Sequence, residues 1–351
     1  MPVAPKTIIR NIFFVILGIG LVWWQLARMT NEEAQALITS IKGTNVFIII
    51  LVTLINVSSH FVRGVRWTML LKPLGYMPRA ETATASFLIG NSANNFLPRV
   101  GEILRCTLLS KKENYKLDRV IGTVVVERIV DGISFLLFIV LTLLMQATTI
   151  SNSIKEKLPT FSHLNWGNLI GIGIVGFAVI AGIIYVLKKS HQKNPENVFL
   201  RKVNTILNHL WEGLTTMKKV KPKGLFIGLT IIMWALYLLQ MYVGFFAIPS
   251  TAHLGIKEAF AVLTLASLAL TITPGGMGTF PLFVMQGLLM FHVPKSSAIT
   301  FGWFMWSISV LINILTGFIA FVLFPYFKKG KNTENVHIAD EITSTLITHN
   351  F

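Results

Sequence analysis

A series of long apolar stretches constrains this chain most, because a helix needs about 20 mostly apolar residues to cross the roughly 30 Å hydrocarbon core of a bilayer. Six stretches meet that requirement when polar ends are allowed: residues 9–27, 46–70, 119–146, 167–187, 224–248 and 296–325. Charged residues make up only 13% of the 351 positions, about half the share found in a soluble domain. The sequence therefore predicts an all-α integral membrane protein with about six full spans.

Two further apolar stretches are broken, and the first covers residues 82–97. It contains three asparagines, Asn94 and Asn95 among them, and basic residues flank it on both sides, including Arg63 and Arg66 before it. Loops rich in Lys and Arg face the cytoplasm. A re-entrant hairpin that enters and leaves on the cytoplasmic side keeps both flanks inside, whereas an ordinary short helix is the structural alternative.

The second broken stretch covers residues 259–292, and each of its halves is too short to span alone. Proline removes a backbone donor and glycine weakens a helix, so both residue types interrupt it. The residues at this break are Pro274, Gly275, Gly276 and Gly278. We expect a second broken hairpin here, with a plain helical hairpin as the alternative.

Loop charge predicts the orientation of the spans. Residues 188–223 carry nine basic residues against two acidic ones, whereas residues 147–166 are nearly neutral. Both termini are then cytoplasmic in a multi-pass protein of the plasma (cell inner) membrane. The net charge of +16 comes from these cytoplasmic loops, where anionic lipid headgroups are the expected partners of Lys and Arg. We therefore expect no nucleic-acid partner.

Each half of the chain, residues 1–147 and 148–327, then has the order span, span, broken hairpin, span, and the second half starts from the opposite side. This order predicts an inverted-topology repeat, a plan found in transporters. We expect one transmembrane domain over residues 1–330 and a flexible cytoplasmic tail over 331–351. Residues 196–217 have apolar positions at helical spacing, which predicts either an interfacial amphipathic helix or a helix packed under the bundle.

Charged side chains within the third span are the first candidates for function. Glu127, Arg128 and Asp131 lie about 12–18 Å into it, and Glu127 and Asp131 share a helix face. A charge at that depth costs at least about 2.5–3.5 kcal/mol, so it needs a partner or a cavity. A buried ion pair with Arg99 or Arg105 is the structural alternative. Both interpretations can hold, because an ion network can exchange one partner for a lipid headgroup.

The segment before this span supplies the remaining candidates. Arg99, Glu102 and Arg105 recur every third residue, and guanidinium groups bind phosphate with two parallel hydrogen bonds. Pro98 and Gly101 would shape the turn. The predicted headgroup-binding residues are Asn94, Asn95, Arg99, Glu102, Arg105, Glu127, Arg128 and Asp131. His60 and Arg63, one helical turn apart, are predicted to extend the same polar zone.

Catalytic chemistry has little support in the sequence. The single cysteine, Cys106, excludes an internal disulfide and a multi-cysteine metal site. The glycines after Pro274 lack the preceding strand and the terminal Lys-Ser/Thr of a phosphate-binding loop. We therefore expect no cofactor, no metal and no enzymatic activity. A membrane-embedded transferase with Glu127 or Asp131 as its base is the alternative.

Three motifs, NNFLPRVGEILR, VVVERIVDG and TPGGMG, occur in this order. Together they resemble the transmembrane region of the lysylphosphatidylglycerol synthase and flippase-like family. The resemblance implies a flippase-like membrane domain, which some members fuse to a cytosolic aminoacyl-lipid synthase domain that we expect this chain to lack. The family motifs fall on Arg99, Glu102, Glu127, Arg128, Asp131, Gly275, Gly276 and Gly278. Members often carry a glutamate after the glycines, where this chain has Thr279-Phe280-Pro281.

The resemblance and the buried charges together predict a lipid-handling membrane protein. We expect flippase-like translocation or binding of a phospholipid or lipid-linked headgroup, with anionic or zwitterionic membrane lipids as partners. A separate cytosolic enzyme is a second expected partner, and a membrane scaffold for such a synthase is a further alternative function.

Overall fold

The computed structural model describes residues 45–96, 100–157 and 220–332, together with residues 23, 35, 38, 39 and 43. Several predicted features lie outside these residues: the spans at 9–27 and 167–187, the helix at 196–217, and the tail beyond residue 332. The chain forms two compact units, residues 1–127 with 220–351 and residues 128–219. The first unit holds nearly all the described elements.

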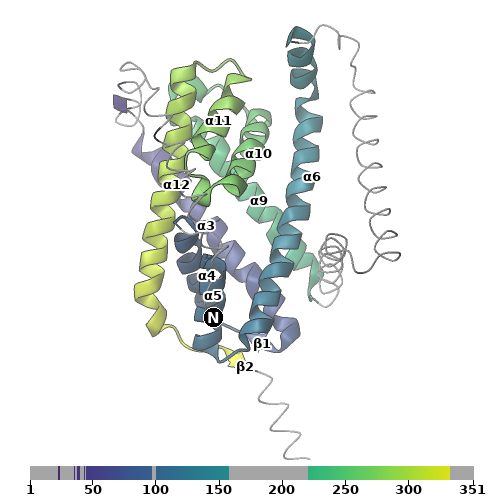
Figure 1. Cartoon of the computed structure of the whole chain (residues 1–351), viewed down its shortest axis with the longest axis vertical. Coiled ribbons are helices and arrows are strands. Elements are labelled where there is room, and N and C mark those ends of the chain that lie inside the picture. The colour runs from purple at the N-terminus through teal and green to yellow at the C-terminus, as the bar shows by residue number, and fades with distance from the viewer. Residues whose placement is uncertain are drawn as a thin grey trace, which may run out of the picture. The chain divides into compact units, whose positions relative to one another are not determined.

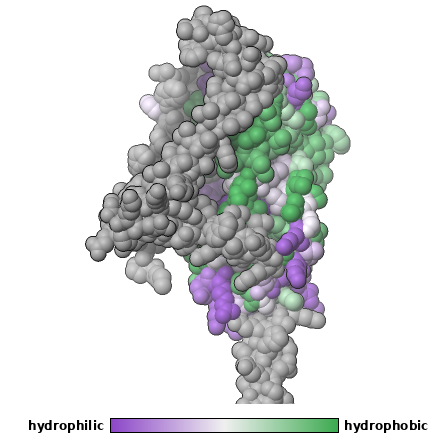
Figure 2. Space-filling view, turned by 90° about the vertical axis from the view of Figure 1, so that its right-hand side faces the viewer, coloured by the Kyte–Doolittle hydropathy of each residue, from purple (hydrophilic) through white to green (hydrophobic). Residues whose placement is uncertain are grey.

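The described part is helical apart from two short strands. Four of its helices are long and apolar enough to cross a membrane. They are α3 (Val46–Leu71), α6 (Leu117–Lys157), α9 (Lys223–Phe245) and α12 (Lys295–Leu323), and they cover four of the predicted spans. On one face the described residues are mostly hydrophobic over the middle and hydrophilic toward the lower end (Figure 2), as expected for a protein surrounded by lipid.

The first broken stretch differs from its predicted form, because residues 82–97 do not themselves contain both arms of a hairpin. Residues 82–94 belong to one helix, α4 (Ala80–Asn94), and α5 (Val100–Glu113) returns beside it (Figure 1). Hydropathy alone did not reveal α5, because its buried face includes Arg105 and Glu113 as well as apolar residues. The arms approach closely at Gly90 and Gly101, where a side chain on either would collide with the other's backbone carbonyl.

The second broken stretch forms α10 (Ile256–Ile272), the 3-10 turn η4 (Pro274–Gly276) and α11 (Thr279–Leu289). The backbone angles at this break explain why glycine occupies three of its positions. Gly275, Gly276 and Gly278 have φ angles of 56°, 70° and 71°, which residues with a Cβ rarely adopt. The two helices lie side by side and α11 packs on α12 (Figure 1).

The two hairpins meet within the first unit. α4 packs against α3 and α12, and α3 packs against α9. Small residues let these helices approach: a side chain on Gly64 would collide with Thr84, and one on Gly317 would collide with Ser92. At the hairpin tips, a Cβ on Gly275 would lie 2.9 Å from Oδ1 of Asn95. The end of α4 therefore touches the break between α10 and α11.

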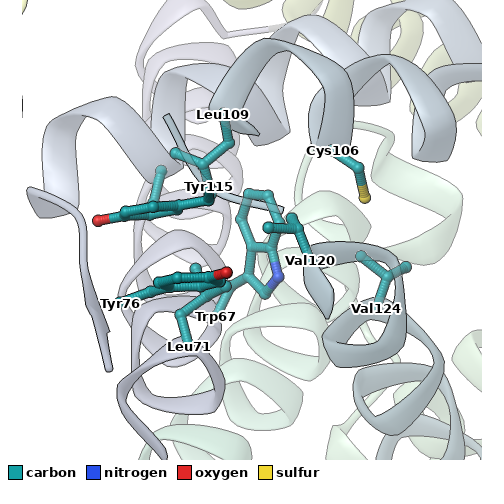
Figure 3. Close-up of a cluster of buried hydrophobic side chains, with 9 residues drawn as sticks. Trp67, Leu71, Tyr76, Cys106, Leu109, Tyr115, Val120 and Val124 are labelled. Carbon is teal, nitrogen blue, oxygen red and sulfur yellow. The ribbon is translucent and has the colours of Figure 1, made fainter. Parts of the chain in front are cut away.

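The end of this unit opposite the second hairpin carries a short two-stranded ladder that the sequence did not predict. After the turn η1 (Lys72–Leu74), β1 (Tyr76–Met77) pairs antiparallel with β2 (Lys331–Asn332). Beside it, Tyr76 stacks on Tyr115 with ring centres 4.1 Å apart (Figure 3). The remaining turns are η3 (Pro249–Thr251) and η5 (Phe324–Tyr326).

Candidate functional site

Glu127 is the centre of a buried ion cluster. Its side chain is completely buried, and Oε1 accepts hydrogen bonds from Nε of Arg63 at 2.8 Å and from Nη2 of Arg66 at 3.3 Å. Its other oxygen, Oε2, accepts from Nη2 of Arg105 at 2.9 Å. Three helices supply this arginine cluster, which we define as Arg63, Arg66, Arg105 and Glu127: α3, α5 and α6.

Aromatic rings surround the guanidinium groups of the three arginines. That of Arg105 lies 4.8 Å from the ring centre of Trp67 and 5.6 Å from that of Phe87. The guanidinium of Arg63 lies 5.4 Å from the same Phe87 ring, and that of Arg66 lies 5.8 Å from the ring of Phe226. Ring faces attract cations and exclude water, so they hold these charges in an otherwise apolar interior.

The local sequence explains why the side chains of the arginine cluster converge. Arg63 and Arg66 are three residues apart, which places both on one face of α3, and Trp67 next to them anchors that helix by donating from Nε1 to Oγ1 of Thr123 at 3.0 Å. Trp67 also joins a hydrophobic core that includes Leu71, Cys106, Leu109, Val120 and Val124 (Figure 3). This core fixes α3, α5 and the start of α6, and with them the charged side chains.

The arginine cluster carries three positive formal charges and one negative, a net of two positive. Burying ions is costly unless hydrogen bonds compensate. Arg105 is only 2% exposed, yet its Nε and Nη1 have no hydrogen-bond partner among the residues that the structure describes. These two nitrogens are donors that a bound anion would satisfy.

The predicted site residues do not all come together. Glu127 and Arg105 pair, as the ion-pair alternative predicted. Pro98 and Arg99 lie outside the described residues, and Glu102 is half-buried in the first turn of α5. Arg128 and Asp131 belong to the second unit.

The predicted asparagines shape the first hairpin's tip. Oδ1 of Asn94 accepts from the backbone N of Gly101 at 2.9 Å and so ties the two arms together. Asn95 is buried and touches Gly275. In this conformation both side chains serve the turn itself.

Arg66 was not among the predicted site residues, because its place beside Arg63 in the basic flank of residues 82–97 indicated a cytoplasmic loop. The structure instead buries it completely within α3. The partner that makes this burial tolerable, Glu127, is 61 residues away in sequence. One signal was present: two arginines three residues apart ahead of Trp67, at the end of an apolar run.

A second polar network lies farther along α3. Nε2 of His60 lies 2.8 Å from Oδ1 of Asn313, and Nδ2 of Asn91 donates to the same oxygen at 3.1 Å. One turn before His60, Nδ2 of Asn56 donates to Oε1 of Gln240 at 3.3 Å. This network, which we term the asparagine–histidine network, joins α3, α4, α9 and α12.

The break in the second hairpin is held by neutral groups. The hydroxyls of Thr273 and Thr279 are 2.7 Å apart, and that of Thr279 donates to the carbonyl of Ala269 at 2.9 Å. Nε1 of Trp306 donates to the carbonyl of Gly275 at 2.9 Å. Within the described ranges, no group of three or more His, Cys, Asp or Glu side chains is placed to hold a metal ion.

Residues 11–324 match the family model of the lysylphosphatidylglycerol synthase transmembrane region. The chain belongs to this family. A UPF0104 membrane protein of Methanocaldococcus jannaschii is 25% identical over 87% of this chain and 94% of its own length, and a second one from the same organism is 26% identical over 58% and 82%.

A relative with a named activity matches a smaller part of the family region. The phosphatidylglycerol lysyltransferase of Bacillus subtilis is 30% identical over 33% of this chain and 13% of its own length. No solved structure matches the chain. Family membership and the apolar helices together establish a multi-pass membrane protein related to the transmembrane region of lysylphosphatidylglycerol synthases.

Proposed function

We propose that this protein handles membrane lipids by binding a phospholipid or lipid-linked headgroup and moving it between leaflets in a flippase-like manner. One observation carries the proposal: three arginines converge on a single buried carboxylate, and buried N–H groups of Arg105 point to no protein acceptor among the described residues. The unpartnered donors of Arg105 suit an anion, and a lipid phosphate is the anion that a membrane supplies in quantity.

Partner exchange is the proposed mechanism. Glu127 holds the three guanidinium groups together while no lipid is bound, and a phosphate then takes over hydrogen bonds from Arg105. Charge-assisted bonds to phosphate are about twice as strong as neutral ones, so they offset the desolvation of the headgroup. Arg63, which is 14% exposed and therefore the most accessible of the three arginines, would meet the phosphate first.

The two helical hairpins provide the proposed route. We propose that α4–α5 and α10–α11 enter the membrane from opposite sides as re-entrant hairpins, one in each half of an inverted repeat. With the spans predicted at 9–27 and 167–187, the chain would then have six spans. Contact between the tips at Asn95 and Gly275 supports this arrangement, because transporter sites form where discontinuous helices meet near the midplane. We also propose that the protein lies in the plasma membrane with both termini cytoplasmic, and loop charge supports this orientation.

We further propose that the chain itself is not an enzyme and works without a cofactor, with anionic or zwitterionic phospholipids as its partners. The match to part of a lysyltransferase supports a second partner, a separate cytosolic enzyme that modifies the headgroup before or after transfer. Co-purification of such an enzyme with the full-length chain would test this part of the proposal.

Reconstitution tests the main proposal. Purified protein in liposomes with acyl-labelled phosphatidylglycerol and phosphatidylethanolamine should accelerate their exchange between leaflets over protein-free vesicles, as measured by dithionite quenching. The variant Arg105→Gln should lose this acceleration. Arg79→Gln is the matched control, because Arg79 forms an exposed ion pair with Glu81, and it should behave like wild type. Equal rates for wild-type and empty vesicles, together with no lipid binding, would overturn the proposal.

A further inference from the structure

Phe87 is a common neighbour of the arginine cluster and of the asparagine–histidine network. The His60 ring centre lies 5.6 Å from that of Phe87, and the guanidinium carbons of Arg63 and Arg105 lie 5.4 and 5.6 Å from it. Both distances run to the Phe87 ring centre, so the His60 ring centre and the Arg105 guanidinium carbon are no farther apart than the sum of the two. One headgroup of ordinary size could contact both.

The two polar regions differ in what they leave to a ligand. The arginine cluster offers donors, namely Nε and Nη1 of Arg105. The asparagine–histidine network has two other buried atoms without a hydrogen-bond partner among the described residues, Nδ1 of His60 and Oδ1 of Asn56. His60 is 8% exposed and Asn56 is 7% exposed. They are four residues apart, so they lie on the same face of α3.

The hydrogen bonds of Asn313 assign the role of His60 Nδ1. Oδ1 of Asn313 accepts from Nδ2 of Asn91, so the oxygen is an acceptor and Nε2 of His60, 2.8 Å from it, carries the hydrogen. In a neutral imidazole the other nitrogen is then an acceptor. While no lipid phosphate is bound, a second cation beside Arg63 in an apolar interior is unfavourable, so the ring is neutral. Nδ1 of His60 and Oδ1 of Asn56 are therefore both acceptors.

We infer that the protein selects lipids whose headgroup carries a hydrogen-bond donor beyond the phosphate, with Arg105 binding the phosphate and His60 and Asn56 accepting from the donor. The inference rests on the proposed function and adds a substrate class to it. Ammonium and hydroxyl headgroups meet the requirement, whereas the trimethylammonium of phosphatidylcholine has no N–H or O–H group. Leaving buried acceptors without a donor disfavours binding of such a lipid.

A methylation series tests this requirement on the wild-type protein. Short-chain phosphatidylethanolamine, its monomethyl and dimethyl derivatives and phosphatidylcholine have the same net charge, but their headgroups carry three, two, one and no N–H donors. They would be titrated into the purified full-length protein by isothermal calorimetry. We expect affinity to stay similar for phosphatidylethanolamine and its monomethyl derivative, which have a donor for each of the two acceptors. Affinity should then fall about tenfold in all across the dimethyl lipid and phosphatidylcholine, because the first leaves one acceptor without a donor and the second leaves both.

Variants assign the effect to residues. His60→Phe and Asn56→Leu should weaken binding of phosphatidylethanolamine to the level of phosphatidylcholine. Thr53→Val on the same helix is the control, because the Thr53 hydroxyl bonds to its own backbone at the carbonyl of Ile49, and it should keep the preference. Equal affinity across the series, or an even decline with each added methyl group, would overturn the inference and leave the proposed function standing. A wild-type protein that binds neither these four lipids nor short-chain phosphatidylglycerol would overturn both.

Discussion

The two hairpins have the same plan but different chemistry. In the first, α5 carries Arg105 into a buried cluster around Glu127. In the second, residues 259–291 contain no charged residue, and the break is held by threonine hydroxyls, glycine conformations and an indole N–H. Both turns sit where helices of this unit converge, so burial alone does not account for the difference.

The comparison assigns different roles to the two hairpins, with ligand binding proposed for the first and packing for the second. A buried charge cluster is costly to build and is weak evidence for stability, so its presence in the first hairpin agrees with the lipid binding that we propose there. The second hairpin meets its backbone needs with neutral bonds and presents Gly275 to Asn95. We therefore expect the second hairpin to contribute packing rather than charge at this contact.

The largest expected effect comes from removing the centre of the charged side. Glu127→Gln leaves three arginines, two of them buried, without their carboxylate, so we expect a loss of about 3–5 kcal/mol in unfolding free energy and loss of lipid binding. Thr279→Val is the counterpart in the second hairpin and should cost about 1–3 kcal/mol. Thermal unfolding in detergent measures both. Equal losses would mean that the two hairpins are held alike.

Close packing at the first hairpin predicts the next effect. Gly101→Ala places a methyl group against the carbonyl of Gly90, so we expect about 1–3 kcal/mol of destabilisation from overpacking. Gly122→Ala is the matched control, because a Cβ there meets no atom of the described chain within 4 Å. It should be neutral or stabilising by up to about 1 kcal/mol. If Gly101→Ala melts like wild type, α4 and α5 are not closely packed.

In the second hairpin, one indole hydrogen bond distinguishes two neighbouring tryptophans. Trp306→Phe loses the bond to the carbonyl of Gly275 and should cost about 1 kcal/mol. Nε1 of Trp303 has no partner among the described residues, so Trp303→Phe should cost less. The comparison is made by the shift in melting temperature. A larger loss for Trp303→Phe would show that the indole of Trp306 does not hold the break.

The smallest expected effect is a pH dependence at the base of the first hairpin, outside the spans. Burial raises the pKa of the Glu113 carboxyl, against a lowering by the hydrogen bond from the Gly330 backbone N at 2.7 Å. Because the folded pKa is above the unfolded one, this contribution to stability is full below the ordinary range of about 4 and is lost as pH rises through the folded value. Melting temperatures across this range should fall less in Glu113→Gln than in wild type. Identical pH profiles would contradict the prediction.

Local sequence was sufficient for much of the fold. The long apolar runs predicted α3, α6, α9 and α12, since bilayer thickness sets helix length. Pro274 and its glycines marked the break between α10 and α11, because backbone geometry there depends on residue type. Glu127 was recognisable as a residue needing a partner, because a charge in an apolar helix is costly.

Only the tertiary structure decided which groups meet. It made α5 the second arm of the first hairpin, brought Arg66 to Glu127, placed Asn95 against Gly275, and joined His60 and Asn91 to Asn313. These pairings depend on contacts between helices far apart in the chain. Periodicity and hydropathy describe each helix alone, so they establish that a buried arginine needs a partner without identifying which carboxylate it finds.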